Sequence, residues 1–307
     1  MNVLLTGASG FLGANILHHF KKMGHHVETI GRSQENDIIA DLATFSGQLN
    51  TKYDLVIHAA GKAHVIPKNP AEEKMFYDVN LQGTKNLLQS FTHPPKKLIF
   101  ISTVAVYGLD HGENIEENCP LNANTPYGKS KVLAENEIIG WSKINKVDTT
   151  ILRLPLIIGK NPKGNLKSMI NAIKKGFYFN IGKGKAKKSM VLVDDISTAL
   201  PKLMNHPNIY HLTDGHDPSF KELSSVIAKE FEVNKIYSIP YFLIKPMAIC
   251  GDVIKKILAI SPPIDSVKLN KINKSLTFND SKARSVGYSS IKILENKEYW
   301  LSQTKSK

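Results

Sequence analysis

The chain has 307 residues, 42% of them hydrophobic, which is enough to form one large domain or two unequal ones. Its net charge of +13 comes from lysines spread along the chain, a pattern that favours a solvated surface over a nucleic-acid site. No apolar stretch is long enough to span a membrane, and the sequence shows no signal-peptide pattern, so we expect a cytoplasmic protein with no transmembrane segment. The histidines and cysteines show no metal-ligand spacing, and two cysteines are too few for a disulfide framework. We therefore expect no metal, and no nucleic-acid partner.

The beginning of the chain combines an apolar strand with a glycine turn. Residues 2–6 predict a buried strand, and an amphipathic helix is expected from Phe11 to Met23. Glycines between them permit a tight turn and a close approach of the backbone to a pyrophosphate, which the free N–H groups of the helix N-terminus attract. This pattern predicts a dinucleotide-binding βα unit. The residues expected at the cofactor are Gly7, Ser9, Gly10, Phe11, Leu12 and Gly13.

Strands and helices alternate up to about residue 155. Strands are expected at residues 26–30, 54–58, 97–102 and 149–154, and helices at 71–91 and 126–141. This alternation of apolar strands with helices predicts an α/β fold, a Rossmann-like, doubly wound parallel sheet whose ligands bind at the carboxyl ends of the strands. Residues 1–155 are therefore expected to form the dinucleotide-binding domain.

The pattern loosens after residue 155. Helices are expected near residues 166–175, 194–204 and 220–231, and strands near 189–193 and 209–212. The apolar stretch 241–260 is interrupted by Pro246 and Gly251, and we expect it to form a buried helix rather than a helix on a membrane surface. A polar tail should follow it and lead to Tyr299-Trp300-Leu301. Residues 156–307 are predicted to form a smaller α/β domain, mainly for substrate, with possible crossings back to the sheet.

Three residues suggest acid–base chemistry. Tyr127 and Lys131 are four apart in the sequence and lie on one face of the predicted helix. An ammonium near a phenol favours the phenolate, so the pair can give or take a proton at a carbonyl or alcohol oxygen. Thr103, just past the strand 97–102, can hydrogen-bond the same oxygen.

A series of motifs, in this order along the chain, resembles the extended short-chain dehydrogenase/reductase family of nucleotide-sugar epimerases, dehydratases and ketoreductases. They are Thr6-Gly-Ala-Ser-Gly-Phe-Leu-Gly13, Ala40-Asp41-Leu42, His58-Ala-Ala-Gly61, Asp78-Val-Asn80, Ile101-Ser-Thr-Val-Ala-Val-Tyr-Gly108, Pro126-Tyr-Gly-Lys-Ser-Lys131, Leu152-Arg-Leu-Pro155 and Val193-Asp-Asp195. The resemblance implies that Tyr127 is the acid/base and that Thr103 is its hydroxyl partner. It also implies that Lys131 lowers the pKa of Tyr127 and holds the nicotinamide ribose.

The resemblance extends the expected cofactor site. It implies contacts from Asp41, Leu42, Ala59, Ala60, Gly61, Asn80, Ser102, Tyr127, Lys131, Leu154 and Pro155. Family members often pair through the helices that correspond to residues 71–91 and 126–141, so a homodimer is implied as well.

Departures from the family pattern narrow the reaction. Dehydratases carry Asp-Glu directly after the catalytic Thr, where this chain has Val104 and Ala105, so that type of dehydration is not expected. Leu156 replaces an Asn that is usual in galactose-type 4-epimerases. Lys188 stands where many members place a phosphate-binding Arg, and we expect Lys188 and Asn165 to bind substrate.

The end of the second strand bears on the cofactor. The strand is followed by Arg32 and Ser33, with no carboxylate before Glu35. Because an acidic residue there would accept hydrogen bonds from the ribose of NAD, whereas Arg and Ser suit a 2′-phosphate, NADP(H) is favoured. NAD(H) stays open, since Arg can also stack on adenine.

The favoured hypothesis is reduction of a 4-keto nucleotide sugar by hydride from NADPH, with Tyr127 as proton donor. One alternative is a nucleotide-sugar 4-epimerase with tightly bound NAD. Another is a non-catalytic, cofactor-binding sensor or assembly protein.

Overall fold

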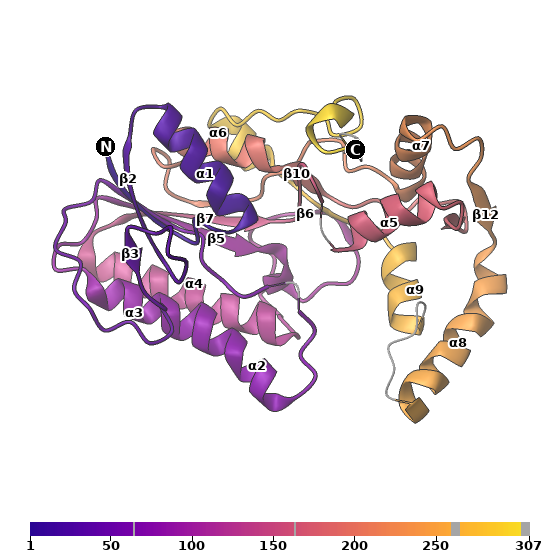
Figure 1. Cartoon of the computed structure of the whole chain (residues 1–307), viewed down its shortest axis with the longest axis horizontal. Helices are drawn as coiled ribbons and strands as arrows, with labels where there is room; N and C mark the ends of the chain where they lie inside the picture. Colours follow the sequence, from indigo (N-terminus) through magenta and orange to yellow (C-terminus); the bar gives the residue numbers. More distant parts are fainter. Residues whose placement is uncertain (64, 163, 259–264, 302–307) are drawn as a thin grey trace.

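The computed structural model describes residues 1–63, 65–162, 164–258 and 265–301, and its centre is a parallel sheet (Figure 1). Seven strands pair in the order β11-β7-β5-β4-β1-β2-β3. They are β1 (Asn2–Thr6), β2 (His26–Gly31), β3 (Ile38–Ile39), β4 (Leu55–His58), β5 (Lys97–Thr103), β7 (Asp148–Leu154) and β11 (Ile209–Tyr210). The chain leaves β1 toward β2 and returns on its other side at β4, so the strand order reverses beside β1. The predicted doubly wound sheet is confirmed.

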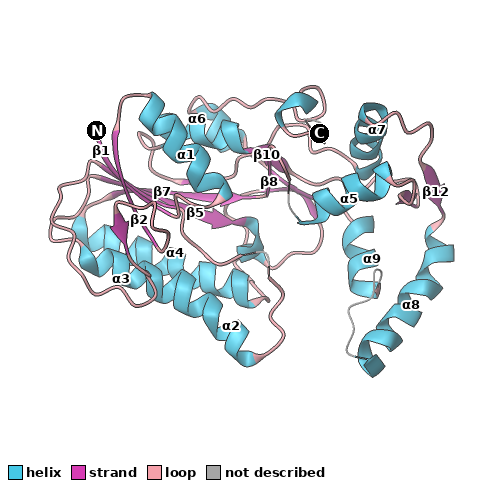
Figure 2. Ribbon diagram, in the orientation of Figure 1, coloured by secondary structure: helices cyan, strands magenta, loops and turns pink. Residues whose placement is uncertain are grey.

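Helices cover both faces of the sheet (Figure 2). Helices α1 (Phe11–Lys22) and α6 (Val193–Leu203) lie on one face, and α2 (Pro70–Tyr77), α3 (Gly83–Ser90) and α4 (Pro126–Asn145) lie on the other. Two-sided coverage explains the near-continuous apolar strands, because every side chain of a central strand then faces a helix layer. All four residues of β4 are buried.

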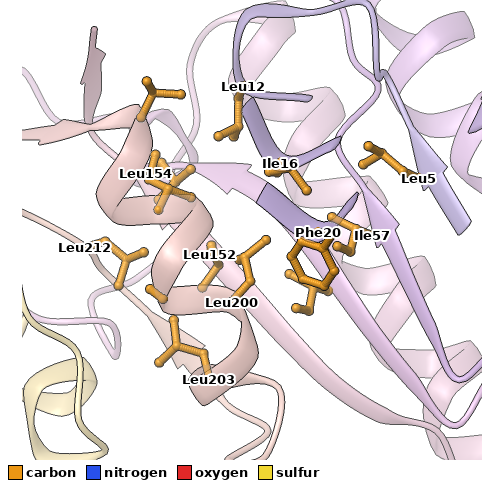
Figure 3. Close-up of a cluster of buried hydrophobic side chains, with 14 of the residues drawn as sticks. Leu5, Leu12, Ile16, Phe20, Ile57, Leu152, Leu154, Leu200, Leu203 and Leu212 are labelled. Carbon is orange, nitrogen blue, oxygen red and sulfur yellow. The ribbon is translucent and has the colours of Figure 1, made fainter. Parts of the chain in front are cut away.

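The larger core cluster lies between the sheet and the pair α1 and α6 (Figure 3). Ile16 and Phe20 of α1 and Leu200 of α6 are fully buried against Leu5 and Leu152 of the sheet. Helix α6 and strand β11 follow residue 155, so the second half of the chain completes both the core and the sheet.

The predicted helix over residues 71–91 is not continuous. A π-helical turn, Asp78–Gln82, separates α2 from α3. A π turn inserts one extra residue and changes which side chain faces inward. Here it buries Asn80, a polar residue that a regular helical pattern would not single out.

Outside the seven-stranded sheet, the described residues form three pairs of short strands, and of these six strands the sequence patterns predicted only the one near residues 189–193. Strand β8 (Leu156–Ile158) pairs with β10 (Met190–Leu192), β9 (Phe179–Ile181) with β12 (Tyr237–Ile239), and β6 (Gly112–Ile115) with β13 (Leu276–Phe278). Helices α5 (Gly164–Lys174), α7 (Phe220–Glu230) and α10 (Ser281–Ser285) and the short turn Lys297–Tyr299 accompany them. At the end of the tail that follows these elements, Trp300 and Leu301 are buried.

The expectation of a buried helix after residue 240 is also wrong. Helix α8 (Tyr241–Leu258) packs beside α9 (Ser266–Asn273) at one end of the molecule (Figure 1). It buries Ile244 and Ala248, but Phe242 is 70% exposed and Met247 is 63% exposed. Within the described part of the chain, no helix is long and apolar enough to cross a membrane.

Candidate active site

The turn between β1 and α1 is built from glycines that have no room for a side chain. Gly7 has a φ of +75°, and a Cβ atom on it would lie 2.7 Å from the Ala60 nitrogen. A Cβ atom on Gly13 would lie 2.0 Å from the Gly7 carbonyl oxygen. The turn, the helix and the loop after β4 therefore approach each other as closely as backbones can.

The N-terminus of α1 is open to an anion. Its N-cap is Gly10, with no side-chain cap and no acidic residue in the first turn. Ser9, Gly10 and Phe11 are exposed there, whereas Leu12 and Gly13 face inward. Unpaired N–H groups at a helix N-terminus suit a phosphate, so these residues fit the pyrophosphate of a dinucleotide.

The end of β2 brings the predicted adenine-side residues together. The Ala40 nitrogen donates to the Gly31 oxygen at 2.9 Å, which places Asp41 and Leu42 beside the turn of Arg32 and Ser33. Arg32 and Asp41 are exposed, and Leu42 is buried. No ion pair among the residues that the structure describes involves Arg32.

The other two arginines each meet a carboxylate with two nitrogens. Arg153 Nη2 lies 2.7 Å from Glu135 Oε2, and Arg284 donates through Nε and Nη2 to Asp280, both at 2.8 Å. Arg32 is therefore the arginine that stays free for a ligand within the described chain.

A directed chain of hydrogen bonds crosses the sheet beneath this edge. The Ala60 nitrogen donates to Thr6 Oγ1, which lies 2.7 Å from His58 Nδ1. On the other side, His58 Nε2 lies 2.9 Å from Thr84 Oγ1, which donates to the Asn80 carbonyl oxygen. Because Thr84 already uses its proton, it must accept from His58 Nε2–H, and Nδ1 must accept from Thr6. His58 is thus neutral, and burial, helped by Lys131, lowers its pKa to about 3.

Asn80 ties the loop after β4 to the helix α4. Its Oδ1 accepts from the Lys62 nitrogen at 2.7 Å, and its Nδ2 donates to the Lys62 oxygen and to Ser130 Oγ. The loop of Ala59, Ala60 and Gly61 is therefore held next to the first turns of α4. In the described structure, the Asn80 side chain is occupied by these protein contacts and acts by positioning the loop.

Tyr127 and Thr103 meet because the first turn of α4 packs against the turn that follows β5. Thr125 caps α4 by accepting from the Gly128 nitrogen, and Pro126 opens the helix. A Cβ atom on Gly128 would lie 2.6 Å from the Ala105 oxygen, so only glycine allows this approach. The Thr103 hydroxyl hydrogen-bonds the Tyr127 phenol and also accepts from the Ala105 nitrogen.

The electrostatics of the pair differ from the expectation. Burial raises the pKa of Tyr127 and outweighs the hydrogen bond from Thr103, which lowers it. The Lys131 ammonium donates to the Ile101 oxygen at 2.6 Å and lies over the Phe100 ring. Burial lowers the pKa of Lys131 to about 7, against an opposing effect of Glu135. Tyr127 therefore holds its proton in this state, because the cost of burying a phenolate exceeds the stabilisation from its neighbours.

A buried ion pair between Arg153 and Glu135 lies behind the site, and sequence patterns did not predict it. Glu135 accepts hydrogen bonds from Ser102 Oγ and from Arg153, and all three side chains are buried. Ser102 thus faces this ion pair. The sequence signals were an arginine inside an apolar strand and a glutamate one helical turn after Lys131.

The predicted substrate residues lie apart from this centre. Lys188 is half-buried in the segment before β10, and burial, together with Lys271, lowers its pKa while Asp110 opposes the shift. Asp110 belongs to the loop that follows Thr103, so Lys188 lies on that side of the sheet. Asn165 is exposed at the start of α5. Leu154 is buried at the end of β7, and Pro155 follows it at the same edge as Thr103.

Comparison with known proteins identifies the family. The sequence profile of the NAD dependent epimerase/dehydratase family matches residues 3–212. The chain belongs to this family. It is therefore an NAD(P)-dependent enzyme, and the extended short-chain dehydrogenase/reductase resemblance is confirmed, which sets aside a non-catalytic sensor.

Individual relatives agree with this assignment. The chain is 32% identical, over 94% of its length and 90% of the relative, to N-acetyl-alpha-D-glucosaminyl-diphospho-ditrans,octacis-undecaprenol 4-epimerase of Escherichia coli O157:H7. It shares its fold with RMD from Pseudomonas aeruginosa complexed with NADPH, at a TM-score of 0.72 and 20% identity over 98% of both chains. Thermus thermophilus UDP-glucose 4-epimerase in complex with NAD has the same fold, at a TM-score of 0.66 and 20% identity over 94% of both chains.

Replacing His58 should change how stability depends on pH. An unfolded histidine takes up a proton below its ordinary pKa of 6.5, whereas folded His58 stays neutral down to about pH 3. The stability that this neutral form contributes is lost as the pH falls through that window, by up to about 1.4 kcal/mol per pH unit. We expect His58→Gln to be destabilised at pH 7 and its deficit in thermal stability to shrink by pH 4. A deficit that stays constant over this range would contradict a neutral, buried His58.

Proposed function

We propose that this enzyme is a 4-epimerase that uses bound NAD and acts on a sugar linked to its carrier through a diphosphate. The observation that carries this proposal is the half-buried Tyr127–Thr103 pair beside an open helix N-terminus at one edge of the sheet. The relative from Escherichia coli, which the chain matches over almost its whole length, bears the name of such an epimerase. Nicotinamide, when bound, supplies a hydride acceptor and donor.

In this proposal the protein moves one proton at the sugar O4 in both directions. Tyr127 Oη exchanges the proton, and Thr103 Oγ1 orients it through their hydrogen bond. Lys131 supplies positive charge near the phenol in its protonated form and binds the nicotinamide ribose. The glycines at positions 7, 10 and 13 and the loop of residues 59–61 hold the dinucleotide within residues 1–155, while residues 156–307 mainly bind substrate.

The diphosphate is the group that nucleotide sugars and polyprenyl-diphosphate sugars share. Lys188 offers positive charge for it beside the loop that follows Thr103, next to Lys271, which forms an ion pair with Asp110 of that loop at 3.5 Å. Leu156 removes an amide that galactose-type epimerases usually use, so these lysines would take over part of that role. Both cysteines are free thiols, which suits the cytoplasm.

A second candidate is reduction of a 4-keto sugar by NADPH. Arg32 favours it, because this side chain is exposed at the end of β2 and has no carboxylate partner among the described residues. A guanidinium there would pair with a 2′-phosphate.

The dinucleotide that the purified protein carries separates the two candidates. We expect denatured protein to release NAD in near-stoichiometric amount, identified by mass spectrometry, because an epimerase returns its hydride to the same sugar. Titration of emptied protein with NADPH and NADH provides the control. An empty site that binds NADPH tenfold tighter than NADH, a difference of about 1.4 kcal/mol, would favour the reductase.

Substituting Tyr127 tests the chemistry. Tyr127→Phe should lower turnover at least 100-fold, since general acid–base catalysis contributes about that much or more. Binding of the dinucleotide should persist. Tyr237→Phe, at a tyrosine that is 64% exposed on β12, is the matched control. The assay follows 4-epimerisation of UDP-linked and polyprenyl-diphosphate-linked N-acetylhexosamines, and an active Tyr127→Phe enzyme would exclude this role for Tyr127.

We also propose a homodimer that forms through α2 and α4. Met75 of α2 and Leu133 and Ile139 of α4 are each at least 40% exposed. We expect Leu133→Lys to convert the dimer into a monomer in sedimentation velocity, whereas Ile144→Lys, at an exposed residue near the end of α4, should not. A wild-type monomer, or a dimer that survives Leu133→Lys, would contradict this interface.

A further inference from the structure

Helix α8 is apolar on the side that faces away from the protein. Eight residues form this outer face of α8: Phe242, Leu243, Pro246, Met247, Ile249, Cys250, Val253 and Ile254. The six large hydrophobic side chains among them are 42% to 70% exposed. At 100° per residue they occupy an arc of about 160° along about 18 Å of helix. Every residue in this arc is apolar.

The opposite side of α8 already has its partners. Ile244 and Ala248 are buried in a small cluster with Ile181 of β9 and Leu269 of α9. Lys245 and Asp252 flank the outer face, and Asp252 accepts a hydrogen bond from the Ser266 nitrogen. A helix that is apolar on both sides is normally buried on both sides. The outer face of α8 is exposed, so no segment of the described chain covers it, and an exposed apolar patch of this kind is typical of an interaction site.

The segments that form this helix and its neighbours contain far more lysines than acidic residues. Residues 164–188 contain seven lysines and no acidic residue, and residues 233–274 contain seven lysines and two aspartates. These two segments, which supply α5, β9, β12, α8 and α9, hold most of the excess positive charge of the chain. Lys183, Lys185 and Lys245 are exposed there. The segments that form α8 and the elements at its end of the molecule therefore carry most of the net positive charge of the chain (Figure 1).

We propose that the outer face of α8 docks the enzyme on an anionic membrane surface. Such a surface offers acyl chains for the apolar arc and negative headgroups for the lysines, which is the combination that interfacial amphipathic helices use. A second copy of this chain would meet the face with the same excess of positive charge. The helix lies in the interface and does not cross the bilayer, in keeping with the hydropathy of the described helices.

Membrane docking also narrows the substrate class. If the proposed function holds, an enzyme at the bilayer surface would reach a diphosphate-linked sugar whose carrier is a polyprenol. The docking itself requires only the outer face of α8 and the lysines around it. Binding to lipid can thus be measured without substrate, so a failure of the proposed function and a failure of docking are separate results.

The test is co-sedimentation of the full chain with vesicles of phosphatidylcholine alone and with about a third phosphatidylglycerol. We expect the protein to partition into the anionic vesicles and to be released as salt rises. The double variant Phe242→Ser, Met247→Ser should lower the partition coefficient at least tenfold. The matched control is Ile66→Ser, Ile144→Ser, which removes two side chains of 83% and 81% exposure outside this helix.

Folding and oligomeric state complete the experiment. The α8 variant should keep its far-UV circular dichroism and its dinucleotide content, because its substitutions are exposed. The proposal would be overturned if the wild-type protein does not bind anionic vesicles, or if the α8 variant binds them as well as the wild type does. A variant that dissociates an oligomer while it still binds vesicles would identify the outer face as a contact between copies, which also overturns docking.

Discussion

The buried pair of Glu135 and Arg153 holds the site together. Glu135 comes from α4, one turn beyond Lys131, and Arg153 comes from the central strand β7. Arg153 also donates to Tyr107 Oη and to the Glu117 oxygen, and Tyr107 bonds His211, which donates to the Asn279 oxygen. One ion pair thus connects the helix of Tyr127 to the sheet and to the C-terminal segments. Removal of either partner would leave a charge buried without its counterion, which typically costs about 3–5 kcal/mol.

The same burial sets the protonation states near the reacting groups. It raises the pKa of Tyr127, lowers the pKa of Lys131 to about 7 and keeps His58 neutral. Tyr127 holds its proton, and Lys131, one helical turn further along α4, has a pKa near neutrality, so a small change of local charge would alter the protonation of either group. Close backbone contacts at Gly7, Gly13 and Gly128 keep the groups in register, because none of these positions has space for a Cβ atom.

Sequence patterns were most reliable where local chemistry determines structure. The glycine turn, the alternating strands and the motif of Tyr127 predicted the sheet and placed the candidate residues at one of its edges. They were least reliable where distant segments decide the outcome. The burial of Asn80 in the π turn, the pairing of the short strands and the burial of Trp300 depend on contacts between segments that are far apart in the chain. Hydropathy also predicted a buried α8, because apolar residues alone cannot reveal that only one side of the helix would be covered.

The sequence by itself determined the fold class, the family and the residue types available for acid–base chemistry. Strand periodicity, glycine spacing and a Tyr and Lys one helical turn apart are local properties, and each follows from backbone geometry. Only the tertiary structure decided that burial would dominate the pKa of Tyr127 and that Glu135 would meet Arg153. It also left one apolar side of α8 exposed. Desolvation, ion pairing and the exposure of a surface depend on which residues are neighbours in space, and a sequence pattern does not specify those neighbours.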